Sequence, residues 1–137
     1  MAGTYHSENA ILVNLFNGGV MTTPSNWYLG LGRTSSVPQE NGSGFTEPAV
    51  GAYARVQVGN NTSNFNVPSS GQLQNITAIN FPESTAAWGT IGYIGFFDAP
   101  TGGNLWFWES ITVKDIVVNT TIIFASNSIT IRMLNSN

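Results

Sequence analysis

The chain contains no cysteine and very few charged side chains. Without cysteine it can form neither a disulfide framework nor a thiolate metal site, so its stability must come from packing. Charged residues make up 8% of the 137 residues, whereas globular proteins usually contain about 25%. Such a surface offers little long-range repulsion between copies and little desolvation cost on contact. The composition therefore favours assembly with other proteins, although an extracellular β domain would look similar.

Positive charge is especially scarce. Four basic residues stand against seven acidic ones, which gives a net charge of -3. This is too few cations to neutralise a row of phosphates, so we expect no nucleic-acid partner. We also expect no membrane partner, because the basic residues are few and no apolar run approaches the length of a bilayer span. The first twenty residues do not resemble a signal peptide, so we expect synthesis in the cytoplasm.

Groups that carry catalysis are also sparse. The single histidine, His6, lies near the N-terminus, so a serine or cysteine triad has no credible base and a histidine-rich metal site cannot form. The acids available for other chemistry are dispersed along the chain; they are Glu47, Glu83, Asp98, Glu109 and Asp115. None sits in a recognisable glycosidase or calcium-binding pattern. We therefore expect a protein that is not an enzyme and that has no catalytic residue, no cofactor and no metal.

Apolar residues, in contrast, are ample. They make up 42% of the chain, and aromatic residues make up 12%. This is enough for one hydrophobic core in a chain of this length. No linker, charge block or internal repeat divides the sequence, so we expect a single domain over residues 1–137.

Residues 7–18 read as a short N-terminal helix. Ser7 suits the N-cap, Glu8 suits the first turn, and Gly18 provides a left-handed stop. The apolar side chains of this helix share one face at helical spacing and are Ile11, Leu12, Leu15 and Phe16. We expect this face to cover the body of the same domain, because amphipathic helices usually do so. Docking on a partner is the alternative, for which Leu12 and Phe16 are the candidate interface residues.

From residue 27 to residue 133 the pattern is that of β-strands separated by turns. Alternating or apolar segments occur at 27–33, 53–58, 76–81, 90–97, 104–111, 117–124 and 128–133. Residues 93–97 and 105–108 should form an aromatic hairpin, and the last two segments should pair around residues 125–127. In the first strand Trp27, Leu29 and Leu31 share one face and glycines the other, so another layer can approach closely. The predicted fold is mainly β, a two-sheet antiparallel β-sandwich or jelly-roll-like domain with one short N-terminal helix.

The sequence Trp106-Phe107-Trp108 allows two arrangements, because successive strand residues point to opposite faces. If both tryptophans point into the core, Phe107 points away from it. Phe107 is then covered either by the helix or the second sheet, or by a neighbouring subunit. A third possibility is that the exposed aromatic rings stack on sugars, as in a lectin. All three aromatic residues are therefore candidate interface residues.

Three stretches of the chain carry a resemblance to a known family. They are the strand at 27–32, the segment Gly51-Ala52-Tyr53-Ala54-Arg55, and residues 86–105 with the pattern A-x-W-G-T followed by F-D-A-x-T-G-G-N-L. The order of these patterns resembles a family of small phage virion structural proteins commonly labelled phage tail fibre proteins, which includes capsid decoration or cement proteins. Trp106-Phe107-Trp108 and the Asn-rich loop at 60–66 depart from the usual pattern and could mark contacts specific to one particle.

The turn in this pattern has a structural logic. Gly102, Gly103 and Asn104 suit a tight turn with positive φ. The Asp98 side chain can accept hydrogen bonds from this turn, and Trp88 can close one end of the sandwich. We expect these five residues to define the fold.

The resemblance implies a component of the virion. Our leading hypothesis is a capsid decoration, or cement, protein that assembles as a homotrimer on the major capsid protein and stabilises its lattice. The alternative is a tail-fibre or baseplate appendage that binds tail proteins, with host-glycan binding by its aromatic residues and Asn-rich loops. An enzyme that acts on cell-wall sugar ranks third.

Overall fold

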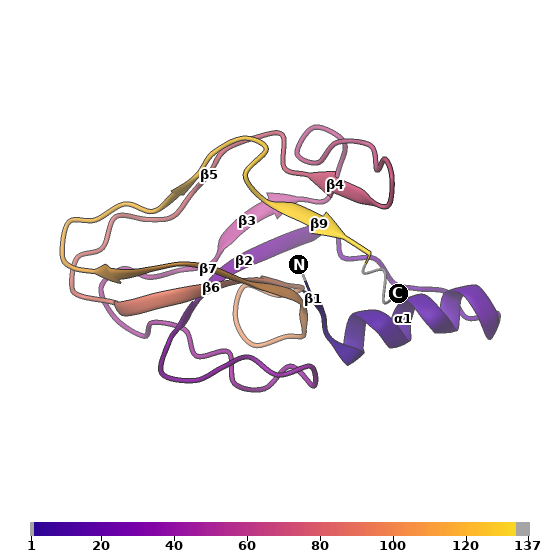
Figure 1. The fold of residues 1–137 in the computed structure, drawn as a ribbon, viewed down its shortest axis with the longest axis horizontal. Coiled ribbons are helices and arrows are strands. Elements are labelled where there is room, and N and C mark those ends of the chain that lie inside the picture. The colour runs from indigo at the N-terminus through magenta and orange to yellow at the C-terminus, as the bar shows by residue number, and fades with distance from the viewer. Residues whose placement is uncertain (1, 134–137) are drawn as a thin grey trace.

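The computed structural model describes residues 2–133, and its architecture is mainly antiparallel β with one short N-terminal helix, as the sequence predicts (Figure 1). The elements in chain order are β1 (Ala2–Gly3), α1 (Tyr5–Phe16), β2 (Asn26–Arg33), β3 (Val56–Gly59), β4 (Gln72–Gln74), β5 (Ile79–Asn80), β6 (Gly89–Phe97), β7 (Leu105–Ile116), β8 (Ile123–Phe124) and β9 (Thr130–Arg132).

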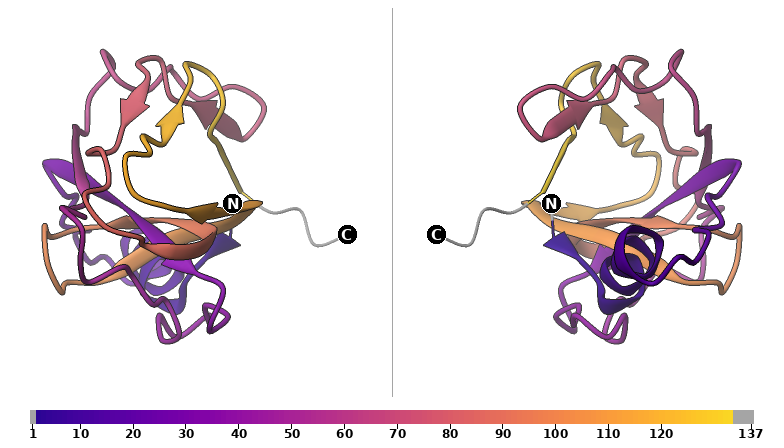
Figure 2. Two further views of the ribbon diagram at one scale, coloured as in Figure 1. Left: turned by 90° about the vertical axis from the view of Figure 1, so that its left-hand side faces the viewer. Right: turned by 90° about the vertical axis from the view of Figure 1, so that its right-hand side faces the viewer.

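Five strands form the main sheet, in the order β1-β7-β6-β2-β3. The predicted aromatic hairpin is its centre, where β6 pairs with β7 and Phe96 lies opposite Phe107. A second layer covers one face of this sheet and consists of two short ladders, β4 with β9 and β5 with β8. Figure 2 shows the two ladders on one side of the main sheet and the loop between β2 and β3 on the other. The sandwich therefore has one continuous layer and one divided layer.

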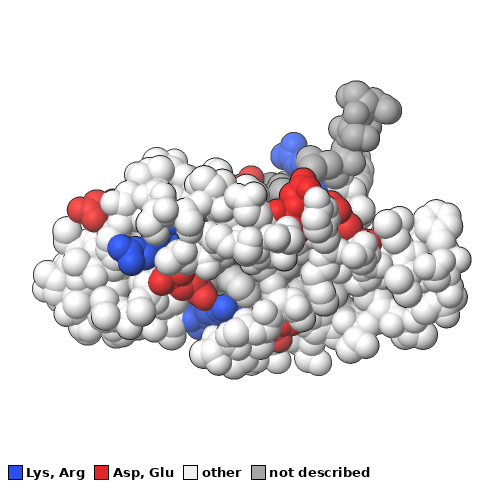
Figure 3. All heavy atoms as spheres, turned by 90° about the horizontal axis from the view of Figure 1, so that it is seen from below, with Lys and Arg blue, Asp and Glu red and all other residues white. Residues whose placement is uncertain are grey.

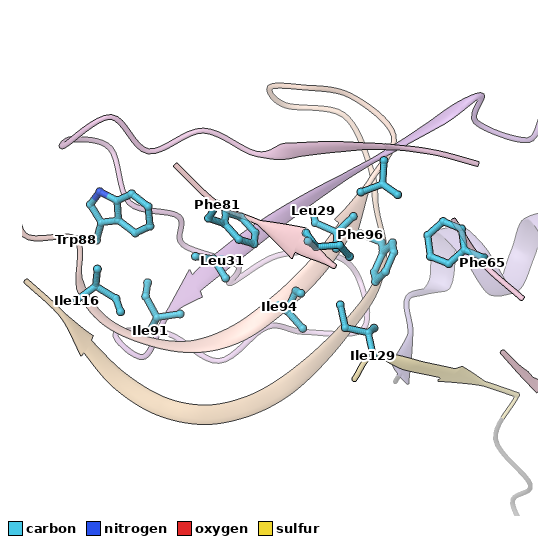
Figure 4. Packing of buried hydrophobic residues seen from close by; sticks show 12 residues of the cluster. Leu29, Leu31, Phe65, Phe81, Trp88, Ile91, Ile94, Phe96, Ile116 and Ile129 are labelled. Carbon is cyan, nitrogen blue, oxygen red and sulfur yellow. The ribbon is translucent and has the colours of Figure 1, made fainter. Parts of the chain in front are cut away.

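The core lies between the main sheet and the two ladders. Alternate residues of β2 and β6, such as Leu29, Leu31 and Ile94, point into it and are almost completely buried (Figure 4). Phe81 and Ile129 reach the same core from the divided layer. Burial of these side chains supplies the main stabilisation of the fold.

The opposite face of the sheet is where the glycines lie. A Cβ atom on Gly95 would stand 2.8 Å from the ring of Phe45 and 2.8 Å from a methyl group of Leu105, and one on Gly32 would stand 3.2 Å from Phe45. The predicted close approach is thus confirmed, and the approaching layer is the loop at residues 34–50. The main sheet is covered on both faces as a result.

The helix begins earlier than predicted. Thr4, not Ser7, is the N-cap, and α1 ends at Phe16, after which Gly18 has the predicted positive φ of 66°. The reason is tertiary, because Thr4 N–H and its side-chain hydroxyl both donate to carbonyl groups at the start of β7. This anchor holds the chain in the geometry from which the helix starts.

The predicted hairpin of 117–124 with 128–133 is wrong. β8 pairs with β5 and β9 pairs with β4, which are segments far away in the sequence. Asn75, which is 1% exposed, explains the difference because it bonds both ladders. Its side-chain amide donates to Thr77 O at 2.9 Å and to Ala125 O at 3.0 Å, and its side-chain oxygen accepts from Ile129 N–H at 2.9 Å.

Several strand boundaries also differ from the prediction. β3 begins only at Val56, because Ala52 has a positive φ of 64° and the chain turns there before it joins the sheet. The segment at 76–81 contributes only β5, whereas β7 continues to Ile116. The short strands β1 and β4 were not predicted at all.

Candidate docking surface

Helix α1 is hydrogen-bonded to the β layers at its first turn. Thr4 and Ser7 are both fully buried there. Thr4 N–H donates to Trp106 O at 3.0 Å, the Thr4 hydroxyl donates to Leu105 O at 2.5 Å, and the Ser7 hydroxyl donates to Thr4 O at 2.9 Å. These bonds fix the direction in which the helix leaves the sheet.

The remainder of α1 projects away from the β layers (Figure 1). Leu12 is 52% exposed, Leu15 64% and Phe16 78%. These three residues, which we call the helix stripe, lie at i, i+3 and i+4 and so share one face. The prediction that the apolar face covers the body of the same domain is wrong for these three residues, because the anchor at the first turn points the helix outward. Ile11, the fourth residue of that face, is half-buried and lies beside Phe107. Leu12 and Phe16, predicted as interface residues, are free to contact another molecule.

The outer part of the helix is also without charge. After Glu8 no Asp, Glu, Lys or Arg occurs until Arg33, and the end of the molecule formed by α1 is almost entirely white in Figure 3. An exposed, uncharged stripe of large apolar side chains is unusual on the surface of a monomer.

An apolar groove opens beside the anchored end of the helix, with a volume of about 390 Å³. We call it the end groove. Its walls are mostly apolar and come from the main sheet, β4 and β9; they include Trp27, Phe65, Leu73, Phe96, Phe107 and Ile131. Gln72 and Arg132 stand among its polar lining residues. Phe96, a fully buried core residue, lies beneath its floor.

The three aromatic residues of β7 lie on two faces, as strand geometry requires. Phe107 faces the second layer, where it packs on the core and lines the end groove. Trp106 is on the opposite face and is 6% exposed, with its ring at 4.7 Å from that of His6 and 5.5 Å from that of Trp27. Trp108 is part-exposed and meets the ring of Tyr93 edge-on at 5.9 Å. Trp106 is thus covered by the N-terminal segment, whereas Phe107 and Trp108 are partly accessible.

The turn from Asp98 to Asn104 is held by the Asp98 carboxylate. It accepts hydrogen bonds from Asn104 N–H at 2.7 Å, from the Asn104 amide at 3.0 Å and from the Trp106 indole at 3.0 Å. Gly102 and Gly103 adopt positive φ, at 60° and 70°. Burial alone would raise the pKa of Asp98, but the three hydrogen bonds outweigh it, and the pKa lies below its usual range. The Asp98 carboxylate therefore stabilises the turn in its charged form.

Trp88 is buried at the opposite end of the core from the end groove. Its indole donates to Gly51 O at 2.8 Å, and its ring meets that of Tyr53 edge-on at 5.3 Å. A Cβ atom on Gly51, whose φ is 69°, would stand 2.7 Å from Ala86 O. The structure thus brings Trp88 together with the Gly51–Arg55 segment, and separates it from the turn that holds Asp98.

Arg55 is the central residue that sequence reasoning missed. Its guanidinium forms a bidentate pair with Glu47 at 2.9 and 2.8 Å, donates to Ala99 O at 2.7 Å and Gly102 O at 2.8 Å, and lies 3.6 Å from the ring centre of Phe97. A single side chain thereby ties the 34–50 loop to the Asp98 turn. Two signals were available in the sequence, namely the rarity of basic residues and the place of Arg55 in one of the stretches that carry the family resemblance.

The Glu47 carboxylate also accepts a hydrogen bond from the Tyr53 hydroxyl at 2.6 Å. Burial, and then the negative charge of Glu47, raise the pKa of Tyr53. The hydroxyl in turn accepts from Leu31 N–H at 2.9 Å. Glu47, one of the acids considered for catalysis, is therefore committed to hydrogen bonds within the fold.

Titratable groups are dispersed over the structure. Within residues 2–133, no three His, Cys, Asp or Glu side chains come close enough together to suggest a metal site. The one helix in that part of the chain is too short to cross a bilayer.

Comparison with known proteins gives one result. The model of a protein family described as podophage GP4 fiber I protein gp80 matches residues 2–132. No curated protein matches the chain.

Proposed function

Because the chain belongs to the family of podophage GP4 fiber I protein gp80, and is therefore a phage fibre-type structural protein, we propose that it is a non-enzymatic subunit of a phage fibre. Its task is to be assembled with other virion proteins, and helix α1 is its attachment element. The exposure of the helix stripe carries this proposal. These side chains are one-half to about three-quarters exposed, so full burial of each would gain on the order of 1–2 kcal/mol, which favours attachment.

The name of the family favours a fibre over the capsid decoration that we placed first from the sequence. Both roles need a surface that binds another virion protein, so the helix stripe suits both. The fibre assignment rests on the family alone, and the location in the particle is what distinguishes the two.

A non-catalytic role agrees with how the acids are used. Glu47 is bonded to Arg55 and Tyr53, and Asp98 is bonded to Asn104 and Trp106. Both carboxylates hold parts of the fold together, and neither faces a second acid across a cleft as glycoside hydrolysis requires.

Cryo-electron microscopy of the parent phage tests the location. We expect density of this fold within a fibre. Density arrayed on the capsid lattice would instead establish the decoration role, and would overturn the fibre assignment.

The double variant Leu15→Gln/Phe16→Gln tests the role of the helix. Both side chains are exposed and glutamine is a good helix former, so the free energy of unfolding should change by less than about 1 kcal/mol. Purified particles that carry the gene for this variant should nevertheless lack the protein. The control is Asn9→Gln, an exposed polar position on α1, which should be incorporated normally. Normal incorporation of the double variant would show that α1 is not the attachment element.

A further inference from the structure

The helix stripe and the end groove are present on one molecule, yet neither fills the other. The first turn of α1 is fixed by Thr4 and Ser7, and beyond it the helix runs away from the β layers. No residue of α1 lines the end groove. Within residues 2–133, each copy therefore carries one apolar projection and one apolar recess that no other part fills.

The two features match in shape. The stripe presents Leu12, Leu15 and Phe16 on a ridge of about one helical turn and a half. The groove of about 390 Å³ offers space for side chains of this kind, with Trp27, Leu73 and Phe107 in its walls. An apolar helix face laid into an apolar groove is a common mode of protein recognition.

The two features also match in charge. The stripe lies in the uncharged part of α1, and the groove has one charged lining residue, Arg132. Contact between them would bring no like charges together, and Arg132 is exposed, so its guanidinium can stay in water at the rim of the groove.

The side chains that such a contact would bury are the three of the stripe. Leu12, Leu15 and Phe16 lie on one face of α1, and each is more than half exposed. A contact centred on three side chains in one groove is smaller than a standard interface, so we expect association that depends on protein concentration.

We propose that the helix stripe of one copy inserts into the end groove of a neighbouring copy. This inference rests on the proposed assembly role and names the partner as a second copy of the same chain. The contact is heterologous, because two different surfaces meet, so it either closes into a ring such as the expected trimer or continues as a row of copies.

Engineered cysteines test the contact directly, because the natural chain has none. Asn17→Cys places a thiol at the end of α1, and Gln72→Cys places one at the rim of the groove; both positions are exposed, and both variants keep the apolar side chains. Under mild oxidation, a mixture of the two single variants should give a disulfide-linked dimer that contains one of each. The control mixture of Asn17→Cys with Val113→Cys, an exposed position on β7 that lines neither feature, should not.

The possible results differ clearly. Cross-links only between two Asn17→Cys copies would show that helices pair with each other, and would overturn the proposal. So would a wild-type protein that stays monomeric by light scattering at high concentration and gives no mixed cross-link. In either case the proposed function would stand if cryo-electron microscopy finds the chain in a fibre and the Leu15→Gln/Phe16→Gln variant is absent from particles.

The double variant gives a second test in solution. If the stripe occupies the groove of a neighbour, Leu15→Gln/Phe16→Gln should be monomeric and folded, while Asn9→Gln keeps the wild-type mass. A double variant that associates as strongly as wild type would contradict the proposal.

Discussion

At the scale of single residues, the few charged side chains do structural work that uncharged residues could not do. Arg55 makes two bonds to Glu47 and two to backbone carbonyl groups, and its side chain is only 7% exposed. The planar guanidinium fits all four acceptors at once, which an ammonium group would not. Arg55, one of four basic residues in the chain, thus joins the 34–50 loop to the Asp98 turn.

The variant Arg55→Ala should lower the free energy of unfolding by about 3 kcal/mol, because it leaves the Glu47 carboxylate half-buried without its partner. Urea denaturation measures the change. The control Lys114→Ala, at an exposed position on β7, should cost less than about 1 kcal/mol. Equal small effects of the two variants would show that the Arg55 pair contributes little.

The Asp98 carboxylate makes the free energy of unfolding depend on pH in the acidic range. Its pKa is lower in the folded chain than in the unfolded chain, so the unfolded chain binds the proton more readily. The carboxylate therefore stabilises the fold fully above the unfolded value of about 3.9, and this contribution is lost as the pH falls through the lower folded value.

The variant Asp98→Asn tests this dependence. At pH 7 it should be less stable than wild type by about 1 kcal/mol, because an acceptor of three hydrogen bonds is replaced by a group that also donates. The difference should shrink when unfolding is measured at pH values below 4. Asp115→Asn, at an exposed position, should show no such change, and a difference for Asp98→Asn that is constant with pH would contradict the argument.

At the scale of elements, the sequence predicts what is local and misses what is distant. The hairpin of β6 and β7 follows from alternating apolar residues and a glycine-rich turn, both of which are visible in one short window. The ladders β4–β9 and β5–β8 have strands of two or three residues, too short for any periodic signal. Their partners are selected by one buried amide, that of Asn75, and nothing in its sequence neighbourhood shows that it is buried.

The helix shows the same limit. Its existence follows from caps and apolar spacing, but its direction depends on hydrogen bonds of Thr4 to β7 about a hundred positions away. Likewise, the glycines of β2 predict that another layer packs closely on that face of the sheet. The pattern does not identify residues 34–50 as this layer. Of the candidate site, Leu12 and Phe16 were predicted, whereas the end groove could not be, because its walls come from strands far apart in the chain.

The variant Asn75→Ala should lower the free energy of unfolding by about 2–4 kcal/mol, because it removes three hydrogen bonds and leaves buried backbone groups without partners. The loss should be concentrated in the divided layer, so amide hydrogen exchange should speed up in β8 and β9 before β6 and β7. Asn80→Ala, at an exposed position in β5, is the control and should be nearly neutral. Uniform exchange throughout the chain would argue against a local role.

At the scale of the whole molecule, scarcity of charge determines how association responds to salt. Screening weakens contacts between charged surfaces, whereas apolar contacts are left intact or strengthened. The uncharged helix stripe and the nearly uncharged end groove belong to the second kind.

Self-association of the wild-type chain should therefore be as strong in 1 M sodium chloride as at low salt. Light scattering at several protein concentrations measures it, and the Leu15→Gln/Phe16→Gln variant provides the monomeric reference. Dissociation at high salt would mean that charged residues elsewhere on the molecule form the contact.

The main sheet of this chain ends in strands of two and four residues, β1 on one side and β3 on the other. Long open edges recruit further strands and lead to fibrillar aggregates, and short ones offer too few free backbone groups to do so. Many copies of a fibre protein are crowded together during virion assembly. β1 pairs only with Phe107 and Trp108, however, so within residues 2–133 the outer side of β7 from residue 109 to residue 116 has no partner strand. Glu109, Lys114 and Asp115 lie on this open edge, and charged side chains there disfavour the addition of a strand from another copy.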